Sequence, residues 1–135
     1  EIAESNQEDV ASYFAAAGAC ARCHSKEFAR WTFSDHAQAW QSLIKRKETE
    51  NPECVLCHST GFAEPGGFGE MDRVSVKKFR AVQCESCHGP MGGHPENTEV
   101  KSIPIVPSSC TSCHDEANSP QFEYGPYLKK SSCQM

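Results

Sequence analysis

Hydrophobic and polar positions along this chain follow a helical period only in short stretches. The clearest stretch covers residues 34–47, where Ser34 is a good N-cap and three basic residues close the last turn. Its predicted hydrophobic face consists of His36, Trp40, Leu43 and Ile44. Asn51-Pro52 is expected to stop this helix.

The remaining pattern predicts shorter elements and long loops. A helix is expected in the second half of residues 1–19 and another over residues 25–33. The glycine-rich segment 61–69 is expected to be irregular, and for residues 74–79 a short strand and a helical turn both stay open. Further expectations are a turn at Gly92–Pro95, an extended connection over 95–109 and a last segment that opens at Ser119-Pro120.

Composition shows that aliphatic side chains cannot supply an ordinary core. Leu, Ile, Val and Phe together make 21 of 135 residues, about 16%, below the roughly 20% that usually accompanies a folded domain. The chain nevertheless carries nine Cys and six His at a formal net charge of only −5. Something other than aliphatic side chains must therefore fill the interior of a single domain over residues 1–135, with residues 1–17 as an N-terminal extension or helix.

Several classes of protein are excluded by the same inventory. There is no run of 18 apolar residues, so no transmembrane segment is expected. An isoelectric point near 5.7 and the lack of a basic run argue against nucleic acid as a partner. The acidic start of the chain has no signal-peptide features, so an exported protein is expected to be present here in its processed form.

Eight of the nine cysteines form four Cys-x-x-Cys pairs, and His follows each pair directly. This is the attachment sequence of c-type haem, in which two thiols bond the porphyrin edge and the next His binds iron. Disulfide, dithiol and zinc sites are alternatives, but none explains a His after every pair. The predicted cofactors are four haem c groups. The four motifs are Cys20-Ala-Arg-Cys23-His24, Cys54-Val-Leu-Cys57-His58, Cys84-Glu-Ser-Cys87-His88 and Cys110-Thr-Ser-Cys113-His114.

Four covalently attached porphyrins would also supply the apolar core that the side chains lack. They add large flat apolar surfaces at about one per 34 residues (135/4). The predicted fold class is therefore mostly α with long loops and little or no β-sheet, a small multihaem cytochrome wrapped around its cofactors.

Histidine is too scarce to give every haem two axial ligands. Once the four motif histidines are counted, only His36 and His94 remain, so at most two haems are bis-histidine within this chain. His94 follows His88 by six residues, a reach of at most about 20 Å, so we expect it to bind the iron of another haem. His36 is likewise expected to reach a neighbouring haem. For each the alternative is an ordinary core or surface histidine.

Over roughly residues 18–133 the chain resembles the tetrahaem cytochromes related to the electron acceptor of hydroxylamine oxidoreductase. The resemblance implies a helical wrapper with closely packed haem pairs, with His24 and His94 on haem 1 and His88 and His36 on haem 3. The residues that carry it are Trp31…Ser34-Asp-His36-Ala, Cys54-x-x-Cys-His-Ser-Thr-Gly-Phe62, Cys84-Glu-Ser-Cys-His-Gly-Pro90…His94 and Cys110-x-x-Cys-His…Ser119-Pro-x-Phe122.

The chain departs from that family at the remaining ligands. The family supplies a C-terminal His to haem 4, but here no His follows His114, and Cys133 falls near that place. Three roles for Cys133 are open: a free thiol, an intermolecular disulfide, or a thiolate ligand to the iron. For haem 2, the family precedent includes a five-coordinate iron, and Met71 and Met91 are alternative thioether ligands.

The function expected from this inventory is electron transfer between redox protein partners in the periplasm or outside the cell, and we lean toward a carrier rather than an enzyme. One alternative is a redox enzyme that acts on a nitrogen oxide, hydroxylamine or a sulfur oxyanion at an open or Cys-ligated haem. The other is a haem-carrying subunit of an oligomer or larger complex.

Overall fold

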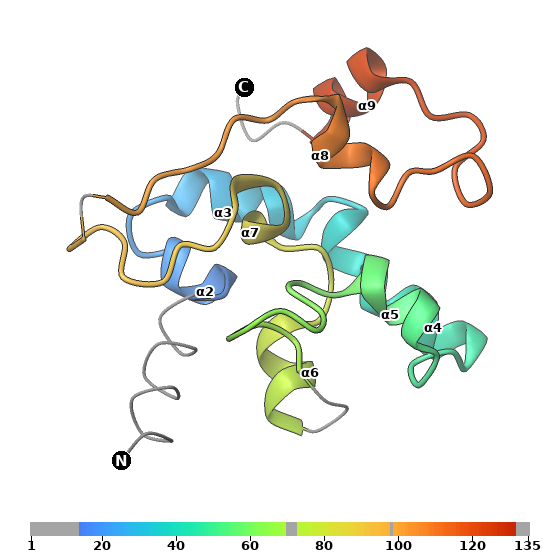
Figure 1. Cartoon of the computed structure of the whole chain (residues 1–135), viewed down its shortest axis with the longest axis horizontal. Coiled ribbons are helices and arrows are strands. Elements are labelled where there is room, and N and C mark those ends of the chain that lie inside the picture. The colour runs from blue at the N-terminus through green and yellow to red at the C-terminus, as the bar shows by residue number, and fades with distance from the viewer. Residues whose placement is uncertain (1–13, 70–72, 98, 132–135) are drawn as a thin grey trace.

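The computed structural model of the chain shows short helices joined by long loops (Figure 1). It describes residues 14–69, 73–97 and 99–131, and within those ranges the only β-pairing is a single antiparallel bridge between Ser59 and Arg80. The predicted mostly helical class without a sheet is confirmed. The helices are α2 (Ala17–Cys20), α3 (Ser25–Thr32), the 3-10 turn η1 (His36–Gln38), α4 (Ala39–Arg46), α5 (Pro52–His58), α6 (Arg73–Phe79), α7 (Cys84–His88), α8 (Pro107–Thr111) and α9 (Tyr124–Ser131).

The helix predicted over residues 34–47 is divided into two pieces. Ser34 Oγ accepts a hydrogen bond from Ala37 N at 3.3 Å and so caps η1, after which α4 continues. Helix α4 ends where Lys47 adopts a left-handed conformation with φ 59°. The prediction that Asn51-Pro52 stops this helix is wrong. Asn51 Oδ1 accepts from Glu53 N at 3.0 Å and so caps the next helix, α5.

In three other segments the structure decides between the predicted alternatives or differs from the prediction. Residues 74–79, left open between strand and helical turn, belong to α6. The extended connection expected over 95–109 ends early, because Pro107 suits the first turn of α8 and Ser109 Oγ accepts from Val106 N at 3.0 Å. At the N-terminus α2 begins only at Ala17. Residues 14–16, which the prediction included, are not helical, and the part of the predicted helix within residues 1–13 lies outside the described ranges.

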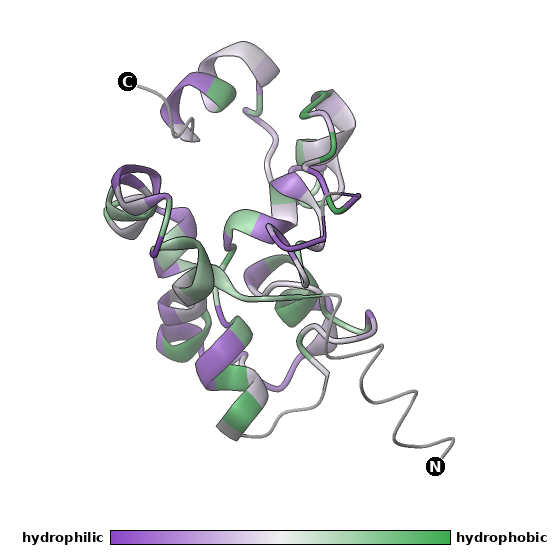
Figure 2. Cartoon of the chain, turned by 90° about the vertical axis from the view of Figure 1, so that its left-hand side faces the viewer, coloured by the Kyte–Doolittle hydropathy of each residue, from purple (hydrophilic) through white to green (hydrophobic). Residues whose placement is uncertain are grey.

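The buried core is small, and its large side chains are mostly aromatic. It centres on Phe68, which is fully buried in the glycine-rich loop and packs against Trp40 with the ring centroids 5.6 Å apart. Several large hydrophobic side chains lie outside it, among them Phe33, which is 91% exposed to solvent. Figure 2 shows hydrophobic positions scattered over separate helices. The polypeptide alone therefore leaves much apolar surface uncovered. The core cluster is Phe14, Ala16, Ala39, Trp40, Leu43, Val55, Phe68, Phe79 and Ala81.

A buried threonine connects the second and third cysteine motifs. Thr60 N donates to Phe79 O at 2.8 Å, and Thr60 Oγ1 donates to Ala81 O at 2.8 Å and accepts from Gln83 N at 2.9 Å. The loop that follows folds back so tightly that a Cβ at Gly67 would lie 2.3 Å from Gly61 O. These contacts fix the end of α5 beside the start of α7.

Two neighbouring positions on α4 test how the core is built. Leu43 is 3% exposed whereas Ile44, predicted on the same buried face, is 48% exposed. We expect Leu43→Ala to lower the free energy of unfolding by about 2–5 kcal/mol, because it leaves a cavity. Ile44→Ala, an isomeric control on the same helix, should cost less than about 1 kcal/mol. Guanidinium unfolding of the haem-loaded protein measures both, and equal losses would contradict the observed burial.

Candidate haem-binding sites

Each Cys-x-x-Cys-His motif lies on a helical turn that brings its first Cys and its His together. In the first and fourth motifs the His N–H donates to the first Cys carbonyl at 2.8 Å, for His24 to Cys20 and for His114 to Cys110. The second motif lies within α5, and the third is the whole of α7. All four motifs therefore present two sulfurs and an imidazole from one turn of chain.

The imidazoles of these motifs are oriented through Nδ1. His58 Nδ1 lies 2.7 Å from Ala39 O, and because a carbonyl only accepts, Nδ1 carries the proton. His88 Nδ1 lies 2.9 Å from Ser102 Oγ, which itself donates to Ile103 O at 3.1 Å and is therefore an acceptor for His88. A proton on Nδ1 leaves the Nε2 lone pair for a metal, as is usual for ligating histidines.

Three further histidines follow the same pattern in part. His114 Nδ1 lies 2.9 Å from Ser119 Oγ, and His94 Nδ1 lies 3.2 Å from Val100 O. His24 Nδ1 is 4.0 Å from the Glu27 carboxylate, a looser contact on the surface. These partners were not predicted from sequence, because serines and carbonyls at irregular separations carry no recognisable motif.

The motif thiols meet in two pairs from distant parts of the chain. The thiol of Cys20 lies close enough to interact with that of Cys84, which joins the first motif to the third, and the thiol of Cys57 likewise with that of Cys113, which joins the second to the fourth. Burial raises the pKa of Cys20, and burial together with the charge of Cys113 raises the pKa of Cys57 to about 12. Groups attached at these sulfurs would therefore lie close together in pairs 1–3 and 2–4.

His36 lies beside His114, the histidine of the fourth motif. Their ring centroids are 6.1 Å apart and the ring planes are inclined by 52°. Two imidazoles that bind one metal from opposite sides have centroids about 6 Å apart, since each metal–nitrogen bond is about 2 Å. This placement departs from the pairing of His36 with His88 that the family resemblance implied.

The surroundings of His36 and His114 suit a metal ligand. Burial, and then the proximity of His114, lower the pKa of His36 against the opposing effect of Asp35, so the imidazole is neutral at pH 7 with a lone pair available. Phe122 stacks on His114 at 5.0 Å and 15°, and Tyr127 meets His114 edge-on at 5.4 Å. The sequence identified both aromatics but not their place around His114.

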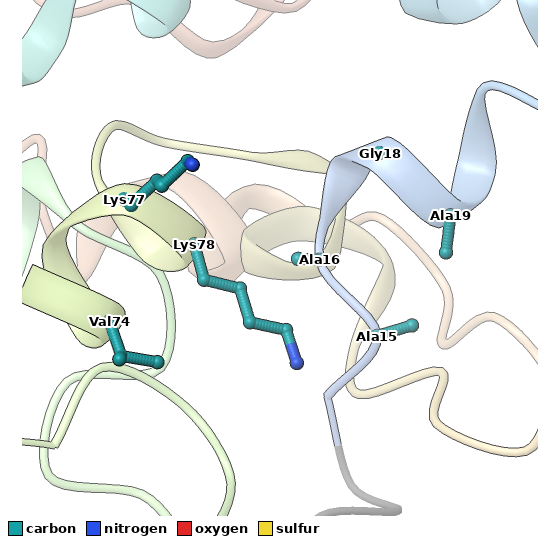
Figure 3. A pocket seen from close by; sticks show the side chains of 7 residues that line it. All are labelled: Ala15, Ala16, Gly18, Ala19, Val74, Lys77 and Lys78. Carbon is teal, nitrogen blue, oxygen red and sulfur yellow. The ribbon is translucent and has the colours of Figure 1, made fainter.

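Two hollows adjoin the first cysteine of a motif, and one of them combines apolar walls with cations. One, between α2 and α6, has a volume of about 550 Å³ and lies next to Cys20 in sequence (Figure 3). Its walls are small side chains with Lys77 and Lys78 at the edge. The other, about 560 Å³, includes Cys54 itself and is lined mainly by polar side chains, namely Arg46, Glu48 and Asn51. The apolar side chains and lysines of the first hollow suit a porphyrin face whose propionates are anionic.

The zinc alternative gains no support from the geometry. Within residues 14–69, 73–97 and 99–131, no three His, Cys, Asp or Glu side chains form a cluster that would hold a metal ion unaided.

In the same residues, no helix has the length and apolarity to cross a membrane. Cys133 and Met71 lie outside the described ranges, and Met91 is held through its backbone N beside the third motif.

Comparison with known proteins identifies the family. The pattern of the family "Cytochrome c554 and c-prime" matches residues 19–89, which is more than half of the chain. The chain belongs to this family. The cytochrome c-554 of Nitrosomonas europaea is 31% identical over an alignment of 86 residues, and the match covers 53% of this chain and 36% of that protein. The match thus spans only about a third of the curated relative.

A solved structure extends the likeness to most of the fold. Reduced cytochrome c554 from Nitrosomonas europaea superposes with a TM-score of 0.67, covering 89% of this chain and 83% of that one at 19% identity. The fold and the four motifs together confirm the tetrahaem class. The protein is a tetrahaem c-type cytochrome with four haem c groups as cofactors, and the resemblance stated from sequence is confirmed.

Proposed function

We propose that each haem is bound by the two thioethers and the His of one motif, in a single domain over residues 1–135. The exposed hydrophobic side chains support this assignment, since they need a large apolar group to cover them. The sites are Cys20, Cys23 and His24 for haem 1, Cys54, Cys57 and His58 for haem 2, Cys84, Cys87 and His88 for haem 3, and Cys110, Cys113 and His114 for haem 4.

For the second axial positions, the proposal assigns His36 to haem 4 and His94 to haem 1. The 6.1 Å between the His36 and His114 rings supports the first assignment. For the second, the carboxylate of Glu85 holds both Ala16, which precedes the first motif, and Met91, which precedes His94. His36 thereby takes the position on haem 4 for which Cys133 was one candidate. Haems 2 and 3 keep an open face or a ligand other than His, with Cys133 and Met71 as remaining candidates.

The function that this geometry supports best is electron transfer. The single observation that carries it is the pairing of motif sulfurs, Cys20 with Cys84 and Cys57 with Cys113. Haems attached at adjacent sulfurs lie close enough for an electron to pass between them without a bound substrate. The protein would then accept an electron at one haem and release it from another, with iron cycling between its ferric and ferrous states.

The proposed partners are other redox proteins outside the cytoplasm. The chain has a formal net charge of −5, and the haem propionates add further negative charge. An acidic carrier docks on basic surfaces in short, salt-sensitive encounters. The proposed location is the periplasm or the cell exterior, because haem c is attached there to the thiols of an exported chain.

Electron transfer is tested by stopped-flow mixing of the reduced protein with oxidised small redox proteins. We expect rapid oxidation by a partner with a basic face, slowing as ionic strength rises, and slow oxidation by an acidic partner of similar potential as the control. Turnover of hydroxylamine, nitrite or a sulfur oxyanion without transfer to any protein would contradict the proposal and favour the enzyme.

The assignment of His36 to haem 4 is tested by electron paramagnetic resonance of the oxidised protein. His36→Ala should convert one low-spin iron to high spin. Ser119→Ala, which removes the partner of His114 Nδ1, should shift the signal of haem 4, and the matched Ser102→Ala should shift that of haem 3. We expect the signal lost in His36→Ala to be the one that Ser119→Ala shifts. Loss of the signal shifted by Ser102→Ala would instead place His36 on haem 3.

A further inference from the structure

Glu85 is a buried carboxylate in the middle of the third motif, between Cys84 and Cys87. It is 3% exposed, and among the buried polar side chains of the described residues it is the only ionisable one. A carboxylate removed from water is costly unless other groups replace its hydration. The contacts of Glu85 therefore indicate why a charge is kept here.

Both carboxylate oxygens of Glu85 accept hydrogen bonds from backbone N–H groups. Oε1 accepts from Ala16 at 2.8 Å, and Oε2 accepts from Ala15 at 2.8 Å and from Met91 at 2.9 Å. Oxygens that only accept suit the ionised form, and hydrogen bonds to a charged acceptor are about twice as strong as neutral ones. The three N–H groups hold a negative charge in place without neutralising it.

This charge lies where the first and third motifs meet. Ala15 and Ala16 lead into Cys20, Glu85 belongs to the helix of Cys84, and Met91 precedes His94. The charge also acts at the first motif itself. The pKa of Cys20, raised mainly by burial, is raised further by repulsion from Glu85. A second negative charge arriving near Cys20 meets the same repulsion.

We propose that Glu85 is a fixed buried anion that lowers the reduction potentials of haems 1 and 3. This inference rests on the haem attachments proposed above. Reduction of either haem adds one electron from a donor to ferric iron and gives ferrous iron, with no bond made or broken. Three backbone N–H groups hold the carboxylate of Glu85 in place, between the first motif and the third. Its charge therefore opposes each reduction across a poorly polarisable interior.

Potentiometric titration of the four-haem protein tests this with three variants. Glu85→Gln keeps the shape and removes the charge, and it should favour reduction of two haems by about tenfold, roughly 59 mV each, for a charge about 10 Å away. Glu85→Asp keeps the charge on a shorter side chain and should change those equilibria by less than about threefold. Glu53→Gln, an exposed carboxylate beside Cys54, is the matched control and should change none by more than about twofold.

The outcomes separate a charge effect from a structural clamp. Equal shifts in Glu85→Gln and Glu85→Asp, or no shift in either, would overturn the proposal. If Glu85→Gln does not load four haems, Glu85 is required for folding or haem attachment and the proposal fails. The intact mass of the parent protein, measured alongside, checks haem attachment separately.

Discussion

The structure depends on one constraint, which is that its polypeptide has too little apolar side chain to close a core by itself. The buried cluster around Phe68 joins only a few short segments, while Phe33 and Val74 face solvent. Covalent attachment of four porphyrins at turns of helix supplies the missing apolar surface and fixes it in place. This explains why helices of eight residues or fewer suffice, and why the loops between them can be long.

Hydrogen bonds to the imidazole rings orient the proposed iron ligands. Nδ1 of His58, His88 and His114 is held by a carbonyl or a serine hydroxyl, so each ring presents Nε2 in a set direction. Two of these partners come from elsewhere in the chain, Ala39 for His58 and Ser102 for His88, whereas Ser119 follows His114 closely. Glu85 extends this linkage from the third motif to the first and adds a charge, so the contact that positions two haems also bears on their potentials.

The sequence predicted those features of the protein that depend on local sequence patterns. Three features could be identified from the sequence alone, because each depends on residues close together in the chain: the four motifs, the helical class and the number of histidines. The pairing of segments was not. His36 meets His114 across 78 positions of sequence (114 minus 36), and no periodicity encodes that contact. Boundaries failed for a related reason: Asn51 is equally suited to follow one helix or to cap the next, and only the packed chain decides.

The most direct test of the central claim is the intact mass of the purified protein after denaturation and acid extraction of any free haem. Haems bonded through thioethers remain on the chain, whereas haems held only by histidine are removed. The account predicts a mass equal to the 14.9 kDa polypeptide plus four haem groups, with haem peptides at all four motifs after proteolysis. A mass equal to that of the polypeptide alone would contradict it.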